Sequence, residues 1–266
     1  MILDTNQRYV QSWSGGKDST CSIVLENLHR DELGIPPSPV IMAEVMFDNE
    51  RGISGEYPDH IEWVYTKAKP LLESWGHKVT IMKSKKDYVS LFRHVVTHSK
   101  HPERNGKKTG FPLGGACAIN GRCKMETFKQ INRETSDSVH IIGIAADETK
   151  RLGGMTGRKV SLLQRYGIFE EDTYRIIKPY GLLSPAYTRG KRGGCWFCMN
   201  QSYAAFAWLK RHYPEYWGYL RELAEESGTI SKYFKYNESF FEVDFKVDNY
   251  LRAPSQISIF EGEGND

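Results

Sequence analysis

Residues 14 to 19 read Ser-Gly-Gly-Lys-Asp-Ser and directly follow the run Tyr9-Val10-Gln11-Ser12-Trp13. Two glycines let a backbone approach an anion closely, and a lysine adds positive charge. Asp, Ser and Thr begin helices well, and the first amides of a helix lack intrahelical partners. The pattern therefore predicts a strand, a phosphate-binding turn and a helix, with a turn that binds nothing as the alternative. The candidate residues are Ser14, Gly15, Gly16, Lys17, Asp18 and Ser19.

The turn is not a Walker A loop, which has glycine five positions before its Gly-Lys pair and Ser or Thr after the lysine. Gln11 and Asp18 occupy those positions here. The hexapeptide instead resembles the PP-loop, Ser-Gly-Gly-x-Asp-Ser, of the ATP pyrophosphatase superfamily. This resemblance implies an adenine nucleotide, ATP, whose phosphates lie on residues 14–19, and a fold of the adenine nucleotide alpha hydrolase type.

Two further segments resemble the phosphoadenosine-phosphosulfate (PAPS) reductase branch of this superfamily. Asp48 ends an apolar run and is followed by Tyr57-Pro58, although Asn49 and Glu50 replace the Thr-Gly of that branch. Residues 143–151 resemble its Gly-x-x-x-Asp-Glu-Ser-x-x-Arg segment. The resemblance implies that Asp48 contacts the nucleoside and that Gly143 belongs to the site. Arg151 would bind phosphate or sulfate, while Asp147 and Glu148 orient it or hold Mg²⁺.

Four of the five cysteines form two close pairs, and a four-thiolate metal site is the leading explanation for them. The cysteines are Cys117 and Cys123, then Cys195 and Cys198 in a C-x-x-C pattern. Unligated thiols or a redox pair are the alternative. Spacing does not separate zinc from a [4Fe–4S] cluster, and the resemblance to PP-loop sulfur-transfer enzymes favours the cluster. Lys191 and Arg192 precede the second pair and could place positive charge near metal and phosphates.

The reaction is constrained by an absence, since no cysteine follows Cys198. Thiol-dependent sulfonucleotide reductases attack with a cysteine near the C-terminus, so that step cannot run here in the same way. We therefore expect cleavage of ATP at the α-phosphate with sulfur transfer, from a sulfur donor to a nucleic acid or small metabolite. A sulfonucleotide reductase or transferase that takes adenylyl sulfate or PAPS with an external thiol is the first alternative. A non-catalytic nucleotide- or nucleic-acid-binding module is the second.

The elements that must position these residues alternate along the chain. Strands are predicted at 8–13, 40–47, 78–82 and 139–144, with helices at about 18–30 and 57–75 between them. This alternation predicts an α/β fold with a doubly wound parallel sheet, and ligands bind at the carboxyl ends of such strands. We expect a nucleotide-binding domain at 1–200 and a helical, aromatic-rich appendage at 201–266. Aromatic residues at 203–219 are expected to pack on the core, with base stacking as the alternative.

Composition and charge limit the classes of partner and the cellular location that we expect for this chain. The chain has 266 residues and a net charge of +3, which suits an anionic substrate without demanding nucleic acid. It has no apolar run of membrane-spanning length and no signal pattern at its start, so we expect a cytoplasmic protein without a membrane partner. Residues 97–116 are polar, basic and rich in helix breakers, which indicates a mobile surface loop.

Overall fold

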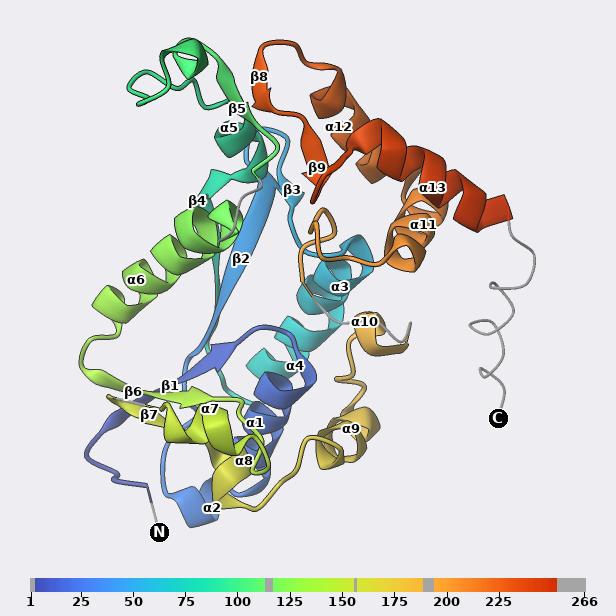
Figure 1. Cartoon of the computed structure of the whole chain (residues 1–266). Coiled ribbons are helices and arrows are strands. Elements are labelled where there is room, and N and C mark those ends of the chain that lie inside the picture. Colours follow the sequence, from blue (N-terminus) through green and yellow to red (C-terminus); the bar gives the residue numbers. More distant parts are fainter. Residues whose placement is uncertain (1–2, 113–116, 156, 189–193, 253–266) are drawn as a thin grey trace. The chain divides into compact units, whose positions relative to one another are not determined.

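The computed structural model describes residues 3–112, 117–155, 157–188 and 194–252. The chain forms two compact units, each assembled from separate stretches of sequence. The first unit contains 1–44, 59–83 and 126–193, and the second contains 45–58, 84–125 and 194–266. Figure 1 shows the elements of both units, which are described separately below.

The sheet has β1 (Arg8–Trp13) at its centre, with β2 (Val40–Asp48) and β6 (Ser138–Ile142) parallel to it on either side. Beyond β6, β7 (Lys159–Val160) is also parallel. β2 also pairs with antiparallel β3 (Ile53–Ser54) and with β4 (Val79–Asp87). A mostly parallel sheet with intervening helices confirms the predicted α/β class, and the four predicted strands are present.

Helices of the first unit lie between these strands along the chain or, from α8 onward, after β7. They are α1 (Lys17–Leu28), α2 (Arg30–Leu33), α3 (Pro58–Trp63), η1 (Val64–Ala68), α4 (Lys69–Ser74), α6 (Met125–Glu134), α7 (Thr149–Gly153), α8 (Leu162–Arg165), α9 (Asp172–Ile177), η4 (Lys178–Tyr180) and α10 (Pro185–Thr188). α1 is buried along most of its length, and its Ile23 and Val24 pack with Ile141 of β6 in one core. This packing holds α1 against β6.

α3, η1 and α4 form one helical run, as predicted for 57–75. Its middle turn, η1, has π-helical hydrogen bonding and ends at Ala68, two residues before Pro70. Proline has no backbone N–H to donate, which accounts for irregular bonding in the turn before it.

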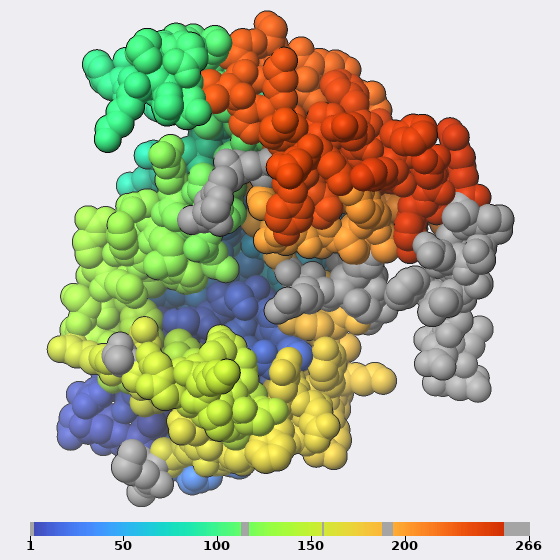
Figure 2. Space-filling view, in the orientation of Figure 1, coloured from blue at the N-terminus to red at the C-terminus, as the bar shows by residue number. Residues whose placement is uncertain are grey.

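The second unit has an aromatic core. Its elements are α5 (Tyr88–Arg93), η2 (Pro102–Arg104), β5 (Lys108–Gly110), η3 (Asn120–Lys124), α11 (Tyr203–His212), α12 (Pro214–Glu225), β8 (Thr229–Ser231), β9 (Tyr233–Lys235), β10 (Glu238–Ser239) and α13 (Phe240–Arg252). Trp196, Phe206 and Phe240 are fully buried, and Trp217 is nearly so. The aromatic stretch 203–219 therefore packs mainly into this core, while α13 lies at the surface of the unit (Figure 2).

Part of the predicted loop at 97–116 is ordered structure. Within its described residues, 97–112, η2 is followed by β5, which pairs in parallel with β8. The predicted division at residue 200 stays a prediction about domains, and the two compact units interleave across it. In the described part of the chain, no helix is both long and apolar enough to span a membrane.

Candidate functional site

The turn after β1 is shaped by two glycines with different constraints. Gly15 has φ +70°, a conformation that side chains disfavour, and a Cβ there would lie 2.5 Å from Cε1 of His60. His60 is buried and hydrogen-bonded through Nδ1 to the hydroxyl of Ser184 at 2.7 Å. Gly16 is the N-cap of α1 and has no side chain to satisfy the helix amides. The first amides of α1 must therefore find partners outside the N-cap side chain, as the amides of a phosphate-binding turn do.

Two serines hold this turn in place. The hydroxyl of Ser19 donates to the carbonyl of Gly16 at 3.1 Å and accepts from the amide of Ser14 at 3.2 Å. The hydroxyl of Ser14 accepts from the amide of Gly16 at 3.3 Å. Its own residues therefore organise the turn.

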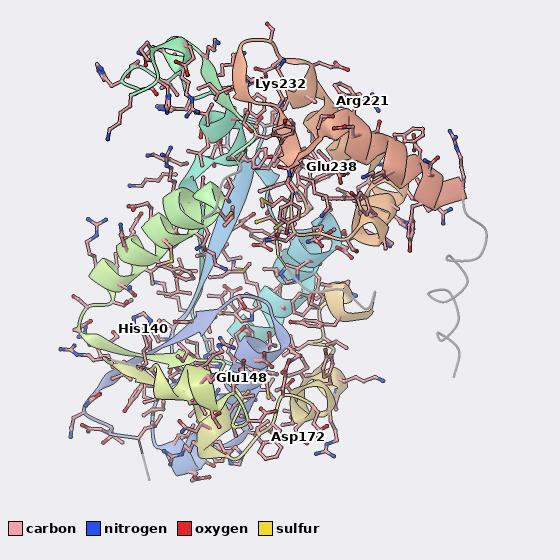
Figure 3. All side chains as sticks on the ribbon, viewed as in Figure 1. His140, Glu148, Asp172, Arg221, Lys232 and Glu238 are labelled. Carbon is pink, nitrogen blue, oxygen red and sulfur yellow. The ribbon has the colours of Figure 1, made fainter. Side chains whose placement is uncertain are left out.

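Residues 143–148 pack directly on the start of α1. A Cβ on Gly143 would lie only 2.3 Å from the backbone nitrogen of Ser19, so no larger residue fits there without backbone movement. Glu148 lies at the start of α7 (Figure 3). Its charge raises the pKa of Asp18. The structure thus brings the segment 143–148 to the turn 14–19, as the two sequence motifs predict.

Lys17 is almost buried and is held by groups from two segments. Its ammonium lies 2.6 Å from Asp18 Oδ1 and 2.9 Å from Glu170 Oε1, and 5.4 Å from the centre of the Tyr174 ring. Burial would lower the pKa of Lys17, but hydrogen bonds and charges of Asp18 and Glu170 raise it overall. Lys17 therefore stays a cation at neutral pH.

The other groups at the start of α1 are also perturbed. The backbone amide of Lys17 donates to the hydroxyl of Tyr187 at 3.1 Å. Burial raises the pKa of Asp18 against the opposing effect of Lys17, and Glu170 and Glu148 raise it further. Burial likewise raises the pKa of the Tyr187 hydroxyl, which stays protonated.

Arg151 is oriented by Glu148. The guanidinium donates to Glu148 Oε1 at 2.6 Å, and the other oxygen of Glu148 accepts the amide of Ala145 at 3.0 Å. Of the two roles predicted for Glu148, the orienting contact is thus present. Arg151 is more than half exposed, so its remaining donors can reach a ligand. Asp147 accepts the amide of Glu170 and thereby supports the segment that carries Glu170.

Asp48 closes its own turn, because its Oδ1 accepts the amides of Glu50 and Arg51. Trp13, the last residue of β1, pairs with Met42 of β2. Asp48 therefore lies six residues along β2 beyond the level at which β1 ends. A buried carboxylate, Glu44, follows Met42 more closely and accepts the Tyr65 hydroxyl at 2.8 Å. Asp48 belongs to the second unit, so its contact with the nucleoside stays a prediction.

All four paired cysteines belong to the second unit. Cys117 precedes η3, and its sulfur accepts the amide of Asn120 at 3.5 Å. Cys123 is buried within η3, a π-helical turn of the kind often found at functional sites. The backbone of Cys195 forms an isolated antiparallel β-bridge with that of Glu56. The carbonyl of Cys195 accepts the amide of Cys198 at 3.1 Å. The backbone thus presents the second pair on one tight turn.

The thiols lie close enough to influence one another. Burial raises the pKa of Cys195 well above its ordinary value, and Glu56, Cys198 and Cys117 raise it further. Burial, Asp87 and Cys117 raise the pKa of Cys123 to about 11. Tyr88 is buried and packs against Phe197, which lies between Cys195 and Cys198 in the sequence, with ring centroids 4.3 Å apart and planes tilted by 47°. Burial raises the pKa of Tyr88, and Cys117, Cys198 and Cys195 raise it further. The Cys123 and Cys195 thiols are therefore protonated at neutral pH in the protein without metal.

The donor set fits a metal chemically, since four sulfurs of one unit suit zinc or an iron–sulfur cluster. Among the described residues, however, no group of three or more His, Cys, Asp or Glu side chains is arranged to hold a metal ion. Binding would therefore require the thiols to lose protons and converge further. The metal site stays a prediction.

Some predicted site residues cannot be placed, and some placed residues were not predicted. Lys191 and Arg192 lie outside the described residues. Glu44, His60, Glu170, Tyr174 and Tyr187 contact the turn or lie near it in register, but no motif marks them. Glu170 follows Gly-Ile-Phe and Tyr187 lies in an ordinary short helix, so only the fold identifies them.

Two basic residues in or beside the aromatic stretch form ion pairs within the second unit. Lys210 and Arg221 both pair with the buried Asp244, which also accepts the indole N–H of Trp217 at 2.7 Å. These two cations are thus engaged by a carboxylate and are poorly available to the phosphates of a nucleic acid. The arrangement gives no support to a binding module built on this stretch.

Comparison with known proteins gives a limited result. No family model and no curated protein matches the chain. Among solved structures, the chain is similar to a U34-tRNA thiolase, NcsA from Methanococcus maripaludis, determined with its [4Fe–4S] cluster. The identity is 17%, the TM-score is 0.42, and the match covers 93% of this chain and 82% of that one. Similarity at this level does not establish function, which has to be inferred from this chain's own residues.

Proposed function

We propose that this protein is a PP-loop adenine-nucleotide enzyme that cleaves ATP between its α- and β-phosphates and serves sulfur transfer. One observation carries the proposal: residues 14–19 form a glycine-rich turn at the carboxyl end of β1, and Gly143 fits tightly against it. A turn of this form, with Lys17 beside the first amides of α1, suits a polyphosphate.

The chemistry follows from charge placement. An acceptor oxygen attacks the α-phosphorus, a new P–O bond forms, and the bond to the β-phosphate oxygen breaks, so pyrophosphate leaves. Lys17 and Arg151 would stabilise the negative charge that develops on the phosphates. Asp18 and Glu148 would hold these cations and could bind Mg²⁺ with the nucleotide. A sulfide-class donor would then form a C–S bond to the acceptor, and AMP would leave with the oxygen.

Cys117, Cys123, Cys195 and Cys198 would hold the metal of this enzyme. Held by four thiolates, a [4Fe–4S] cluster would have every iron ligated by the protein and would supply redox capacity, whereas zinc would make the site structural. Tyr88 and Phe197 would pack beside it and exclude water.

Product analysis tests the proposed cleavage. Wild-type protein incubated with Mg²⁺ and ATP labelled at the α-phosphate should give labelled AMP or an AMP adduct, together with pyrophosphate. Lys17→Ala should reduce pyrophosphate release by about 100-fold or more, because it removes the buried cation. Release of ADP and inorganic phosphate, or unchanged turnover of Lys17→Ala, would show that the assignment is wrong.

The nucleotide itself is tested by calorimetry. Titration with ATP, adenylyl sulfate and PAPS should show tightest binding of ATP. Preference for a sulfonucleotide would instead favour the reductase or transferase reading with an external thiol, since Lys17 and Arg151 suit sulfate as well as phosphate.

A further inference from the structure

Residues 170–187 place protein groups on the atoms of the turn that would bind phosphate. Glu170 Oε1 lies 2.9 Å from the ammonium of Lys17, and the Tyr187 hydroxyl accepts the amide of Lys17 at 3.1 Å. A carboxylate oxygen and a hydroxyl oxygen therefore take the positions of two ligand oxygens, one at the cation and one at the helix amide.

The contact is built from one segment. The Tyr174 ring lies under the Lys17 ammonium and meets the Tyr187 ring edge-to-face at 5.7 Å between centroids. Asp147 Oδ1 accepts the amide of Glu170. The Tyr187 hydroxyl lies only 3.3 Å from the position that a Cβ on residue 16 would take, so glycine at this position lets the hydroxyl approach the turn closely. The segment thus meets the turn through three side chains and is anchored beside it.

We propose that Glu170 and Tyr187 are surrogate ligands of the phosphate-binding turn, which an incoming nucleotide must displace, and that Glu170 thereby selects metal-bound over metal-free polyphosphate. This inference rests on the proposed function. A free polyphosphate is repelled by Glu170 and Asp18 on either side of Lys17, whereas a Mg²⁺ complex carries less negative charge. Displacement costs affinity but rejects small free anions.

Calorimetry on conservative variants tests the inference, with three probes: ATP in EDTA, ATP in excess MgCl₂, and inorganic pyrophosphate in EDTA. Glu170→Gln should bind metal-free ATP and pyrophosphate roughly threefold to tenfold more tightly than wild type, with a smaller gain for the Mg²⁺ complex. Tyr187→Phe, which frees the Lys17 amide, should also tighten binding of both metal-free probes. Glu171→Gln removes an equal charge from an exposed neighbour and should change nothing.

The outcomes separate this inference from the proposed function. Weaker Mg²⁺–ATP binding by Glu170→Gln, with metal-free binding unchanged, would make Glu170 a ligand of the metal complex and overturn the inference alone. Weaker binding of every probe by Tyr187→Phe would make Tyr187 a direct phosphate ligand and would likewise overturn it. If wild type and every variant bind none of the probes, both the inference and the proposed function fail.

Discussion

The turn at residues 14–19 is more fully organised than the cysteine quartet, which comprises Cys117, Cys123, Cys195 and Cys198. The turn is fixed by the Ser14 and Ser19 hydroxyls, a positive φ at Gly15 and the close approach of Gly143. The quartet lies within one unit and its thiols perturb one another, but no three of its members meet as a metal site in the described chain. The proposed phosphate site is therefore shaped by the polypeptide alone, whereas the proposed metal would have to complete its own site.

The largest effect should come from closing the space between Gly143 and α1. We expect Gly143→Ala to lower the free energy of unfolding by about 3 kcal/mol or more, because its Cβ meets the backbone of Ser19. Gly218→Ala, in the middle of α12, meets nothing within 4 Å and should be neutral or stabilising. Urea unfolding measures both. Equal stability of Gly143→Ala and wild type would mean that the turn is not rigid.

Removing one thiol should test whether the cysteine quartet binds the metal. After anaerobic reconstitution, Cys195→Ala should lose at least roughly nine-tenths of its bound iron or zinc, since each ligand of a four-thiolate site is required. Cys21→Ala removes a fully buried thiol of the α1 core and should keep its metal. Metal analysis and absorbance decide the result. Equal metal content in the two variants would remove the quartet as the binding site.

The proposed contact of Arg151 with phosphate can be tested against a matched arginine, Arg175, of the same unit. Arg151 and Arg175 each pair at 2.6 Å with an acid three residues earlier, but only Arg151 belongs to the predicted phosphate-binding motif at 143–151. Arg151→Ala should weaken ATP binding by about tenfold, as expected for a charge-assisted contact to phosphate. Arg175→Ala should leave the dissociation constant within about twofold of wild type. Similar losses in both variants would indicate a general charge effect.

Lowering the pH should reduce the stability of the two units in different pH ranges. We expect this effect to be smaller than those of the substitutions above. Burial and Lys159 lower the pKa of His140 in the first unit below 6.5, so its contribution to stability falls as the pH drops below about 6.5. In the second unit, Lys210, Trp217 and Arg221 overcome burial and lower the pKa of Asp244 below 3.8, so its contribution is lost only at still lower pH.

Hydrogen exchange at pH 7, 5.5 and 4.5 can separate these responses. Amides of β6 around His140 should lose protection first, and those of α13 around Asp244 should be unchanged over this range. His140→Gln should remove the first loss. Simultaneous loss in β6 and α13 would contradict the assignment.

The sequence predicts local structure better than it predicts the site. Strand 8–13 and the turn follow from apolar residues, glycines and helix-start residues that act over a few positions, and the structure has them. Gly143 is predictable only through the family motif, and its physical reason, the contact with Ser19, needs the fold. Glu170 and Tyr187 could not be predicted, since 153 and 170 residues separate them from Lys17 and no local pattern encodes such contacts.

The interleaving of the two units also escapes the sequence. A boundary at residue 200 follows from a change in composition, yet residues 45–58 and 84–125 share an aromatic core with the C-terminal region. Apolar strands such as β2 look the same whichever core they enter. Phe47 packs on Trp196 at 4.5 Å between ring centres, a contact that only the three-dimensional structure reveals.

The central claim is that residues 14–19 bind the phosphates of ATP, and calorimetric titration of wild type and Lys17→Ala with Mg²⁺–ATP tests it most directly. Lys67→Ala, which removes an exposed lysine of the same unit, serves as the control. The account predicts that Lys17→Ala binds at least about tenfold more weakly than wild type, while Lys67→Ala binds equally well. Equal affinity of Lys17→Ala and wild type, with both proteins folded, would contradict it.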